Sequence, residues 1–367
     1  MLADKVNPHL SLAIPAWRSG GIEVKLDRAS ASALSALCLL GTTSTAHADE
    51  LAAAPSVSIS ARLIGEATSE RSFKVEAFAD GETPLPVGES VAASWLDSST
   101  GQQATAIAVV DQDNIARFQI RSWRSTELTV VYGVEQIQLD VPVAPARQPV
   151  KPPSKAPLQR TSFRVNPDPA ALGDGANAVI ASLSPARRSS MMGRSWHRGC
   201  VPMSSLREVQ VNYWGADGYR HRGVLIAHAS VAKAVRTAFT SLYRIGYRIR
   251  SMHPVDAYGR NPKGFGANDY ASMAAGNTSM FNCRYQVGKE HRRVWSPHAG
   301  GRAIDLNPWE NPYLAPGGIY PNRWWFQNRA SSPMVIKSGS QVTRILRNNG
   351  WAWGARYKDY QHFDYHG

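Results

Sequence analysis

The stretch Ser296-Pro297-His298-Ala299-Gly300-Gly301-Arg302-Ala303-Ile304-Asp305 lies near the end of a 367-residue chain, and Asp359-Tyr360-Gln361-His362-Phe363-Asp364 follows it. Two imidazoles and one carboxylate, from His298, His362 and Asp305, fill three of the four positions around a zinc ion and leave the fourth for water. Asp359 precedes His362 by three residues and could accept a proton from that water. On spacing alone, unrelated surface groups are the alternative to a catalytic zinc site.

Gly300 and Gly301 predict a tight bend that leads into a short strand over residues 302–306. His298 and Asp305 are too far apart in sequence to share one helical turn, so a loop and a strand would have to bring them together. The upstream segment 269–284 reads DYASMAAGNTSMFNCR, and two further aromatic segments occur at 307–313 and 350–354.

These motifs, in this order, resemble the zinc peptidases that include D-alanyl-D-alanine carboxypeptidases and L-alanyl-D-glutamate endopeptidases. The resemblance rests on Ser-x-His-x-x-Gly-x-Ala-x-Asp at 296–305, on Asp-x-x-His-Phe at 359–363 and on the three aromatic or polar segments named above. It covers about residues 191–367. It implies an α+β zinc-peptidase domain with a small antiparallel sheet and flanking helices.

The resemblance also implies a role for each matching residue. His298, Asp305 and His362 would hold one zinc ion. Asp359 would act as the general base and would then return the proton to the leaving amine.

Two more residues receive roles in the same way. Arg284 would stabilise the oxyanion, and an ordinary surface arginine is the alternative. Ser296 would lie near the substrate, and a structural hydrogen bond would explain it equally well. The implied substrates are the stem peptides of peptidoglycan. The implied bond is a terminal D-alanyl-D-alanine bond, with an internal L-alanyl-D-glutamyl or cross-bridge bond as the alternative.

A non-catalytic protein that binds the cell wall is the competing class, but a complete ligand set with Asp359 and Arg284 favours an enzyme. The formal charge of +13 favours a polyanionic partner. Arg187, Arg188, Arg194 and Arg198 form a basic cluster that could attract an anionic cell-wall polymer, or could simply be a solvated face. Nucleic acid is not an expected partner because it fits poorly with export.

Residues 55–143 are predicted to form an all-β, immunoglobulin-like sandwich. Apolar residues alternate with polar ones over 57–63, 73–79 and 137–141, and short apolar runs occur at 104–110, 115–120 and 128–132. No clustered His, Cys or paired carboxylates occur there, so a spacer or a binding module is expected.

Residues 144–190 are predicted to be a proline-rich linker and connector, extended and semi-rigid in its first half. The zinc-peptidase domain would begin at Met191. Within it, 209–213 and 223–227 predict a β-hairpin around Gly215-Ala216-Asp217-Gly218. A helix capped by Ser230 and ended by Gly246 follows, then a strand over 247–252. A later amphipathic helix carries Val342, Ile345 and Leu346.

Residues 1–48 are typical of a secretory signal. Lys25 and Arg28 precede the apolar stretch 29–40, and Thr45-Ala46-His47-Ala48 predicts cleavage after Ala48. An Ala-rich disordered tail is the alternative, and the long segment before Lys25 indicates either an extended leader or a later start of translation. No apolar run reaches the roughly 20 residues of a membrane-spanning helix. The expected location is secreted or cell envelope, with no transmembrane anchor.

The cysteines are consistent with an oxidising compartment. Cys38 would leave with the signal, so the mature chain keeps Cys200 and Cys283. The two either form a disulfide or stay separate buried thiols.

Overall fold

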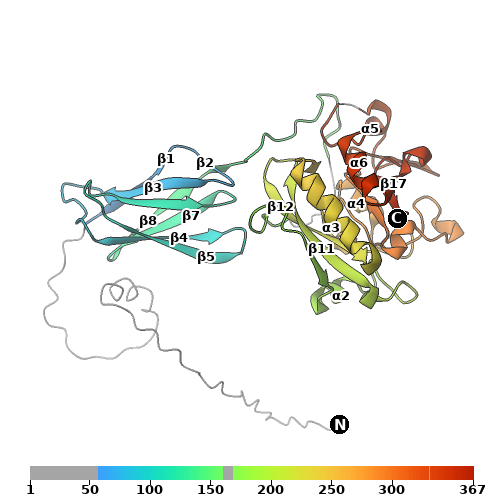
Figure 1. Ribbon diagram of the computed structural model, residues 1–367, viewed down its shortest axis with the longest axis horizontal. Coiled ribbons are helices and arrows are strands. Elements are labelled where there is room, and N and C mark those ends of the chain that lie inside the picture. Colours follow the sequence, from blue (N-terminus) through green and yellow to red (C-terminus); the bar gives the residue numbers. More distant parts are fainter. Residues whose placement is uncertain (1–56, 160–167, 330) are drawn as a thin grey trace, which may run out of the picture. The chain divides into compact units, whose positions relative to one another are not determined.

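The computed structural model describes residues 57–159, 168–329 and 331–367 (Figure 1). The predicted leader, residues 1–48, lies outside these ranges. The described chain mixes helices with several small, mostly antiparallel sheets. None of its helices is both long and apolar enough to cross a membrane.

Over residues 57–144 of the described chain, the regular elements are all strands. They are β1 (Ile59–Ile64), β2 (Ala67–Thr68), β3 (Ser72–Ala79), β4 (Ser90–Asp97), β5 (Gln102–Val109), β6 (Ala116–Arg121), β7 (Thr126–Tyr132), β8 (Glu135–Val141) and β9 (Val143–Ala144). One antiparallel sheet has the order β1-β3-β6 and a second has the order β5-β4-β7-β8, while β2 and β9 form a short parallel pair.

Both larger sheets contribute to one hydrophobic core. Because side chains alternate along a strand, Phe73, Val75 and Ala77 of β3 all face inward, and so do Leu128 and Val130 of β7. The sequence analysis did not predict β4. Its buried residues also alternate, at Val91, Ala93 and Trp95, so the signal was present in the sequence.

The C-terminal part contains both helices and strands. They are β10 (Val179–Ser182), α2 (Pro185–Met191), η2 (Met203–Ser205), β11 (Leu206–Gly215), β12 (Arg220–His228), α3 (Ala229–Arg244), β13 (Arg248–Ile249), η3 (Val255–Tyr258), α4 (Asp269–Ala274), η4 (Glu290–Arg292), η5 (Pro297–Gly300), β14 (Ala303–Asp305), β15 (Tyr313–Ala315), β16 (Gly318–Tyr320), α5 (Arg323–Asn328), α6 (Gln341–Asn348), β17 (Trp351–Trp353), η6 (Gly354–Tyr357) and β18 (His362–Tyr365).

The expected hairpin is present as β11 and β12, joined by a turn over 216–219. The expected helix is α3, which lies across this sheet (Figure 1) and buries Val231, Val235, Ala238, Phe239 and Leu242 against it. These positions recur every three or four residues, which places them on one helical face.

Three local features differ from the sequence analysis. The residue that caps α3 is His228, whose ring accepts a hydrogen bond from the backbone N–H of Ser230. The strand expected over 247–252 is limited to β13, which pairs with the end of β11. Residues 179–191, expected in the connector, form β10 and α2; β10 pairs with β11, and Met191 is buried beneath the sheet.

A smaller sheet of order β14-β18-β17 carries the C-terminal motif. In its register Asp305 lies directly opposite His362, and Ile304 lies opposite Phe363. Phe363 and Ile304 are fully buried in the same core as α3, so this small sheet is anchored to the larger one. The anchoring fixes the place at which Asp305 and His362 face each other.

Candidate active site

Three elements bring the predicted metal ligands together. His298 lies in η5, whose first residues are capped when Ser296 Oγ accepts a hydrogen bond from the His298 backbone N–H, at 3.3 Å. Gly301 ends η5 with a positive φ of 64°, a conformation that favours glycine. Asp305 ends β14 and His362 begins β18, and antiparallel pairing places these two residues opposite each other.

The donor atoms of these three residues converge. His298 Nε2 lies 3.1 Å from His362 Nδ1 and 3.2 Å from Asp305 Oδ2, and His362 Nδ1 lies 3.1 Å from Asp305 Oδ1. In a tetrahedral zinc site with bonds of about 2.0–2.1 Å, neighbouring ligand atoms are about 3.3 Å apart. The spacing of the three donors therefore fits a zinc ion.

The outer ring nitrogens fix the orientation of both imidazoles. His298 Nδ1 donates to the Met280 carbonyl at 2.5 Å, and His362 Nε2 donates to Asp364 Oδ1 at 2.9 Å. In the neutral tautomers that carry these outer protons, the lone pairs of His298 Nε2 and His362 Nδ1 face each other beside the Asp305 carboxylate. Facing lone pairs repel unless a cation lies between them, so the donor set suits a metal. The sequence analysis missed Asp364, which follows His362 by two residues and therefore shares its face of β18.

Neighbouring charges shift the pKa values of the ionisable side chains in the site. Burial would raise the pKa of Asp305, but the imidazoles of His298 and His362 hold it well below its usual range. Burial would lower the pKa of His362, but the neighbouring Asp305 and Asp364 carboxylates raise it instead, because they favour the protonated imidazolium. Asp364 has a lowered pKa because His362 offsets the effect of its burial. The site thus favours positive charge between its carboxylates.

Asp359 lies beside these donors at the end of the turn that precedes β18. Its Oδ1 atom is buried and has no hydrogen-bond partner among the described residues. Burial, together with the neighbouring Asp305 carboxylate, raises the pKa of Asp359 to about 8, although His362 and Arg284 oppose this shift. A carboxylate with this environment is suited to taking up a proton.

Arg284 also reaches the site, and it is held from two sides. Its guanidinium forms a buried ion pair with Asp269 at 2.6 Å and donates to the Tyr285 carbonyl at 3.0 Å, whereas Nε is buried without a partner in the described chain. Gly266 packs against it so closely that a Cβ there would lie 2.6 Å from the Arg284 Cβ. Asp269 was not predicted as a site residue, although it begins the segment 269–284.

All six predicted residues line one cavity of about 490 Å³. The other side chains that line it are Asp269, Met273, Gln286, Val287, Lys289, Pro297, Tyr313, Leu314, Pro316, Tyr357, Gln361 and Asp364. Ser296 lies in this wall and also makes the structural hydrogen bond described above, so both of its expected readings are compatible with its position. A pocket with carboxylates, imidazoles and one guanidinium is suited to hydrolysis of a polar substrate.

Residues 289–365 match the model of the D-alanyl-D-alanine carboxypeptidase family. This match confirms, over that segment, the resemblance seen in the sequence motifs, and it identifies a peptidase segment. The segment includes His298, Asp305, Asp359 and His362, whereas Arg284 lies just outside it. No curated protein matches the chain.

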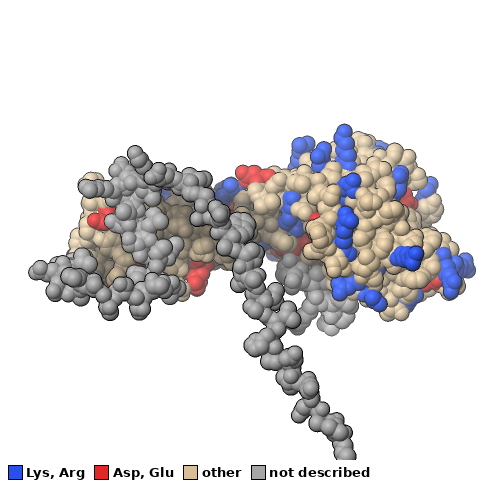
Figure 2. Space-filling view, turned by 90° about the horizontal axis from the view of Figure 1, so that it is seen from below, with Lys and Arg blue, Asp and Glu red and all other residues tan. Residues whose placement is uncertain are grey.

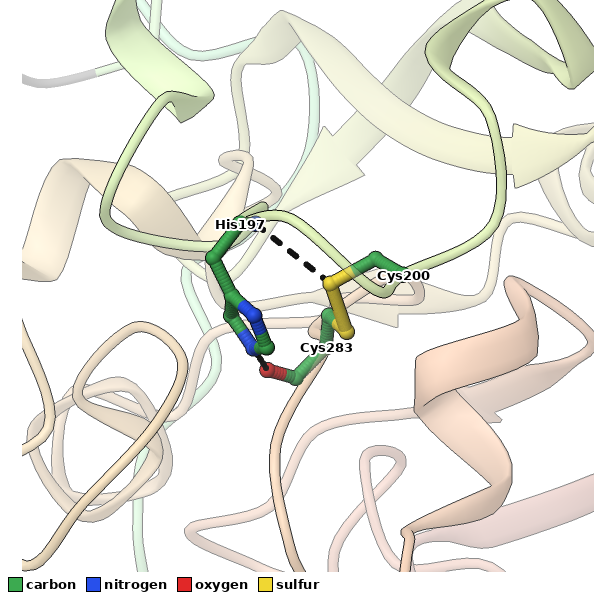
Figure 3. Close-up of side chains that lie close together, drawn as sticks. All are labelled: His197, Cys200 and Cys283. Carbon is green, nitrogen blue, oxygen red and sulfur yellow. Dashed lines mark hydrogen bonds between the residues drawn. A yellow bond between two sulfur atoms is a disulfide. The ribbon is translucent and has the colours of Figure 1, made fainter.

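The two cysteines of the described chain form a disulfide between Cys200 and Cys283 (Figure 3). It joins the loop after α2 to the residue that precedes Arg284. The structure therefore excludes the alternative of two separate thiols. The sequence could not decide between them because the two residues lie 83 positions apart.

Proposed function

We propose that this chain is an exported zinc metallopeptidase that hydrolyses peptide bonds in the stem peptides of peptidoglycan, with a D,D-carboxypeptidase-like specificity. The observation that carries the proposal is the convergence of His298, Asp305 and His362 at zinc-ligand spacing inside the cavity that holds Asp359. The family match over 289–365 supports the reaction class and the kind of substrate.

His298 Nε2, His362 Nδ1 and an Asp305 oxygen would hold the metal. When bound, zinc would supply Lewis-acid activation of water and polarisation of the substrate carbonyl. Asp359 accepts a proton from the attacking water and delivers it to the leaving amine. Its burial, which raises its pKa, favours the uptake of that proton.

Arg284 donates hydrogen bonds to the oxygen that becomes negative in the transition state. Its ion pair with Asp269 fixes the guanidinium in advance, so little reorganisation is needed when the charge develops. Ser296, whose backbone N–H donates to the Arg284 carbonyl, would contact the substrate from the same wall of the cavity.

The remainder of the chain would place this peptidase at the cell wall. We infer that residues 55–143 are an immunoglobulin-like sandwich that acts as a spacer or binding module, which their two sheets around one core support. The charges support an anionic cell-wall polymer as a partner of the other part: Lys and Arg outnumber Asp and Glu 24 to 9 over residues 191–367, whereas acidic residues prevail 12 to 6 over 57–143. Figure 2 shows the basic side chains spread over the surface of the C-terminal part.

The test uses the full chain, because a fragment that began at Met191 would lose β10 and with it one strand of the main sheet. The protein is incubated with peptidoglycan and with synthetic stem peptides, with and without a chelator, and products are identified by mass spectrometry. The expected result is loss of a terminal D-alanine that the chelator abolishes and zinc restores.

Two other results would change the proposal. An internal cut would indicate an endopeptidase of the L-alanyl-D-glutamate or cross-bridge type. Absence of any product, with zinc demonstrably bound, would indicate a wall-binding protein without peptidase activity.

A further inference from the structure

Four aromatic rings form a continuous cluster close to the candidate site. The His197 and Phe265 rings stack with centroids 4.5 Å apart, and the Tyr285 and Trp295 rings lie 4.7 Å apart. Two further contacts, between His197 and Trp295 and between Phe265 and Tyr285, close the cluster. Phe265 is 52 % exposed and Trp295 is 46 % exposed, so large ring faces remain in contact with solvent.

The cluster is held rigidly at its His197 side. Figure 3 shows His197 beside the disulfide, with its backbone N–H directed at Cys200 Sγ at 3.4 Å. The His197 ring nitrogen Nε2 lies 3.1 Å from the Cys283 carbonyl oxygen, to which it donates. The disulfide therefore fixes the loop that carries His197 onto the segment that carries Arg284. A fixed ring loses little conformational freedom when a ligand packs on it.

A short β-hairpin over residues 284–296 carries two rings of the cluster, Tyr285 and Trp295, and one wall of the cavity. Tyr285 and Trp295 form a bridged pair across it, and the Ser296 backbone N–H donates to the Arg284 carbonyl at 3.0 Å. Because adjacent residues point to opposite faces of a strand, Arg284 and Ser296 face the cavity while Tyr285 and Trp295 face the other way. The Tyr285 and Trp295 rings thus lie on the side of this segment that faces away from the cavity.

We propose that this aromatic cluster binds a sugar ring of the glycan strand to which the stem peptide is attached. The proposal rests on the proposed peptidase function. The axial C–H bonds of a pyranose ring present an apolar face, which packs on an aromatic ring, and the two exposed rings offer such surfaces.

The size of the exposed rings favours a sugar over a protein partner. Two half-exposed rings supply at most a few hundred Å² of contact, far below the roughly 1,000 Å² of a stable protein interface. Tyr285 directly follows Arg284 and Trp295 directly precedes Ser296, and both Arg284 and Ser296 line the cavity. A glycan attached to a peptide in the cavity would therefore lie near these rings.

The first test compares two substrates that share one stem peptide, with and without the disaccharide attached. In the full-length protein, Trp295→Ala and Phe265→Ala should each lower kcat/KM for the sugar-linked substrate about tenfold, the effect of one aromatic contact, and leave the free peptide within about twofold. Val294→Ala is the matched control, because Val294 is exposed on the same hairpin but has no ring. An equal loss on both substrates, or no loss on either, would overturn the proposal.

The second test does not depend on cleavage. Saturation-transfer NMR with a β-1,4-linked N-acetylglucosamine tetrasaccharide should detect binding to the wild-type protein, and the Trp295→Ala variant should bind about tenfold more weakly. Absence of wild-type binding at millimolar sugar, or unchanged binding by the variant, would overturn the proposal. If the wild-type protein cuts neither substrate but binds the sugar, the peptidase function fails while the sugar site stands.

Discussion

The two parts of the described chain bury different kinds of side chain. In residues 57–143 the buried polar residues are Ser69 and Ser122, and every other buried side chain is apolar. In residues 168–367 of the described chain the buried residues include many with ionisable side chains, namely Glu208, Arg220, Arg222, Arg248, Asp256, Asp269, Arg284, His298, Asp305, Glu310 and His362. Burying a charge lowers the free energy of unfolding unless the charge is paired. These buried residues therefore stabilise the C-terminal part less than apolar residues in the same places would.

The comparison separates structural charges from those suited to chemistry. Arg187 pairs with Glu208, Arg250 with Glu310 and Arg284 with Asp269, so each of these carboxylates has a cation beside it. Asp359 has no side-chain hydrogen bond or ion pair within the described residues, although its Oδ1 is buried. An unpaired carboxylate beside three convergent donors has the environment expected of a group that takes part in a reaction.

The largest effect is expected for Asp359→Ala. The variant should retain zinc, because the three donors are untouched, but should lose about 10²–10⁴-fold in turnover of a stem peptide, the usual contribution of a positioned proton acceptor. Turnover is followed by mass spectrometry and zinc content by elemental analysis. Asp140→Ala, at an exposed carboxylate of β8, is the matched control and should behave as wild type. Normal cleavage by the Asp359 variant would remove it from the role of general base.

His362→Ala should abolish tight metal binding. One of three donors is lost, and the Asp305 and Asp364 carboxylates lose the partner that both contact. The zinc affinity should fall by more than the roughly 10–100-fold that is typical for an outer hydrogen-bonding partner. Competition with a chromophoric chelator measures it. Full retention of zinc would exclude His362 as a ligand.

A smaller effect is expected for Asp364→Asn. Asp364 accepts the outer proton of His362, and an amide oxygen can still accept it, though without the charge. The loss of zinc affinity should lie near the lower end of the roughly 10–100-fold range that is typical for such partners. For Asp364→Ala the loss should lie nearer the upper end of that range. If both variants bind zinc like the wild type, the contact with His362 does not orient the ligand.

Local chemistry made much of this molecule predictable. The Gly215-Ala216-Asp217-Gly218 turn indicated the hairpin, and the helical spacing of Val231, Val235 and Leu242 indicated α3. The ligand set followed from motifs that resemble a known family. The same local rules should have found β4 through its alternating Val91, Ala93 and Trp95.

Features that depend on distant pairing could not be predicted. The opposition of Asp305 and His362 comes from a register between strands 57 residues apart, and the disulfide joins residues 83 apart. β10 has only four residues, and their burial shows no clear alternation. It forms because it can pair with the edge of β11. Asp269 became recognisable only when the fold placed it against Arg284.

The smallest effect on activity is expected for Leu128→Ala. Leu128 is fully buried in the core shared by the two N-terminal sheets, and the cavity left by its truncation should cost about 2–5 kcal/mol of unfolding free energy. Calorimetry should detect a lowered transition, whereas turnover of a soluble stem peptide below that transition should stay within about twofold of wild type. That outcome is expected because none of the residues that line the candidate cavity comes from residues 57–143 of the described chain.

Phe239→Ala provides the matched perturbation in the C-terminal part. Phe239 lies in the core that also holds Ile304 and Phe363, the neighbours of Asp305 and His362 in their strands. Its truncation should cost about 3–5 kcal/mol and should also lower zinc affinity, since the small sheet would lose its support. If the Leu128 variant instead lost turnover in proportion to its loss of stability, the N-terminal sheets would be coupled to the site. The contrast between an N-terminal part that only folds and a C-terminal part that carries the chemistry would then be wrong.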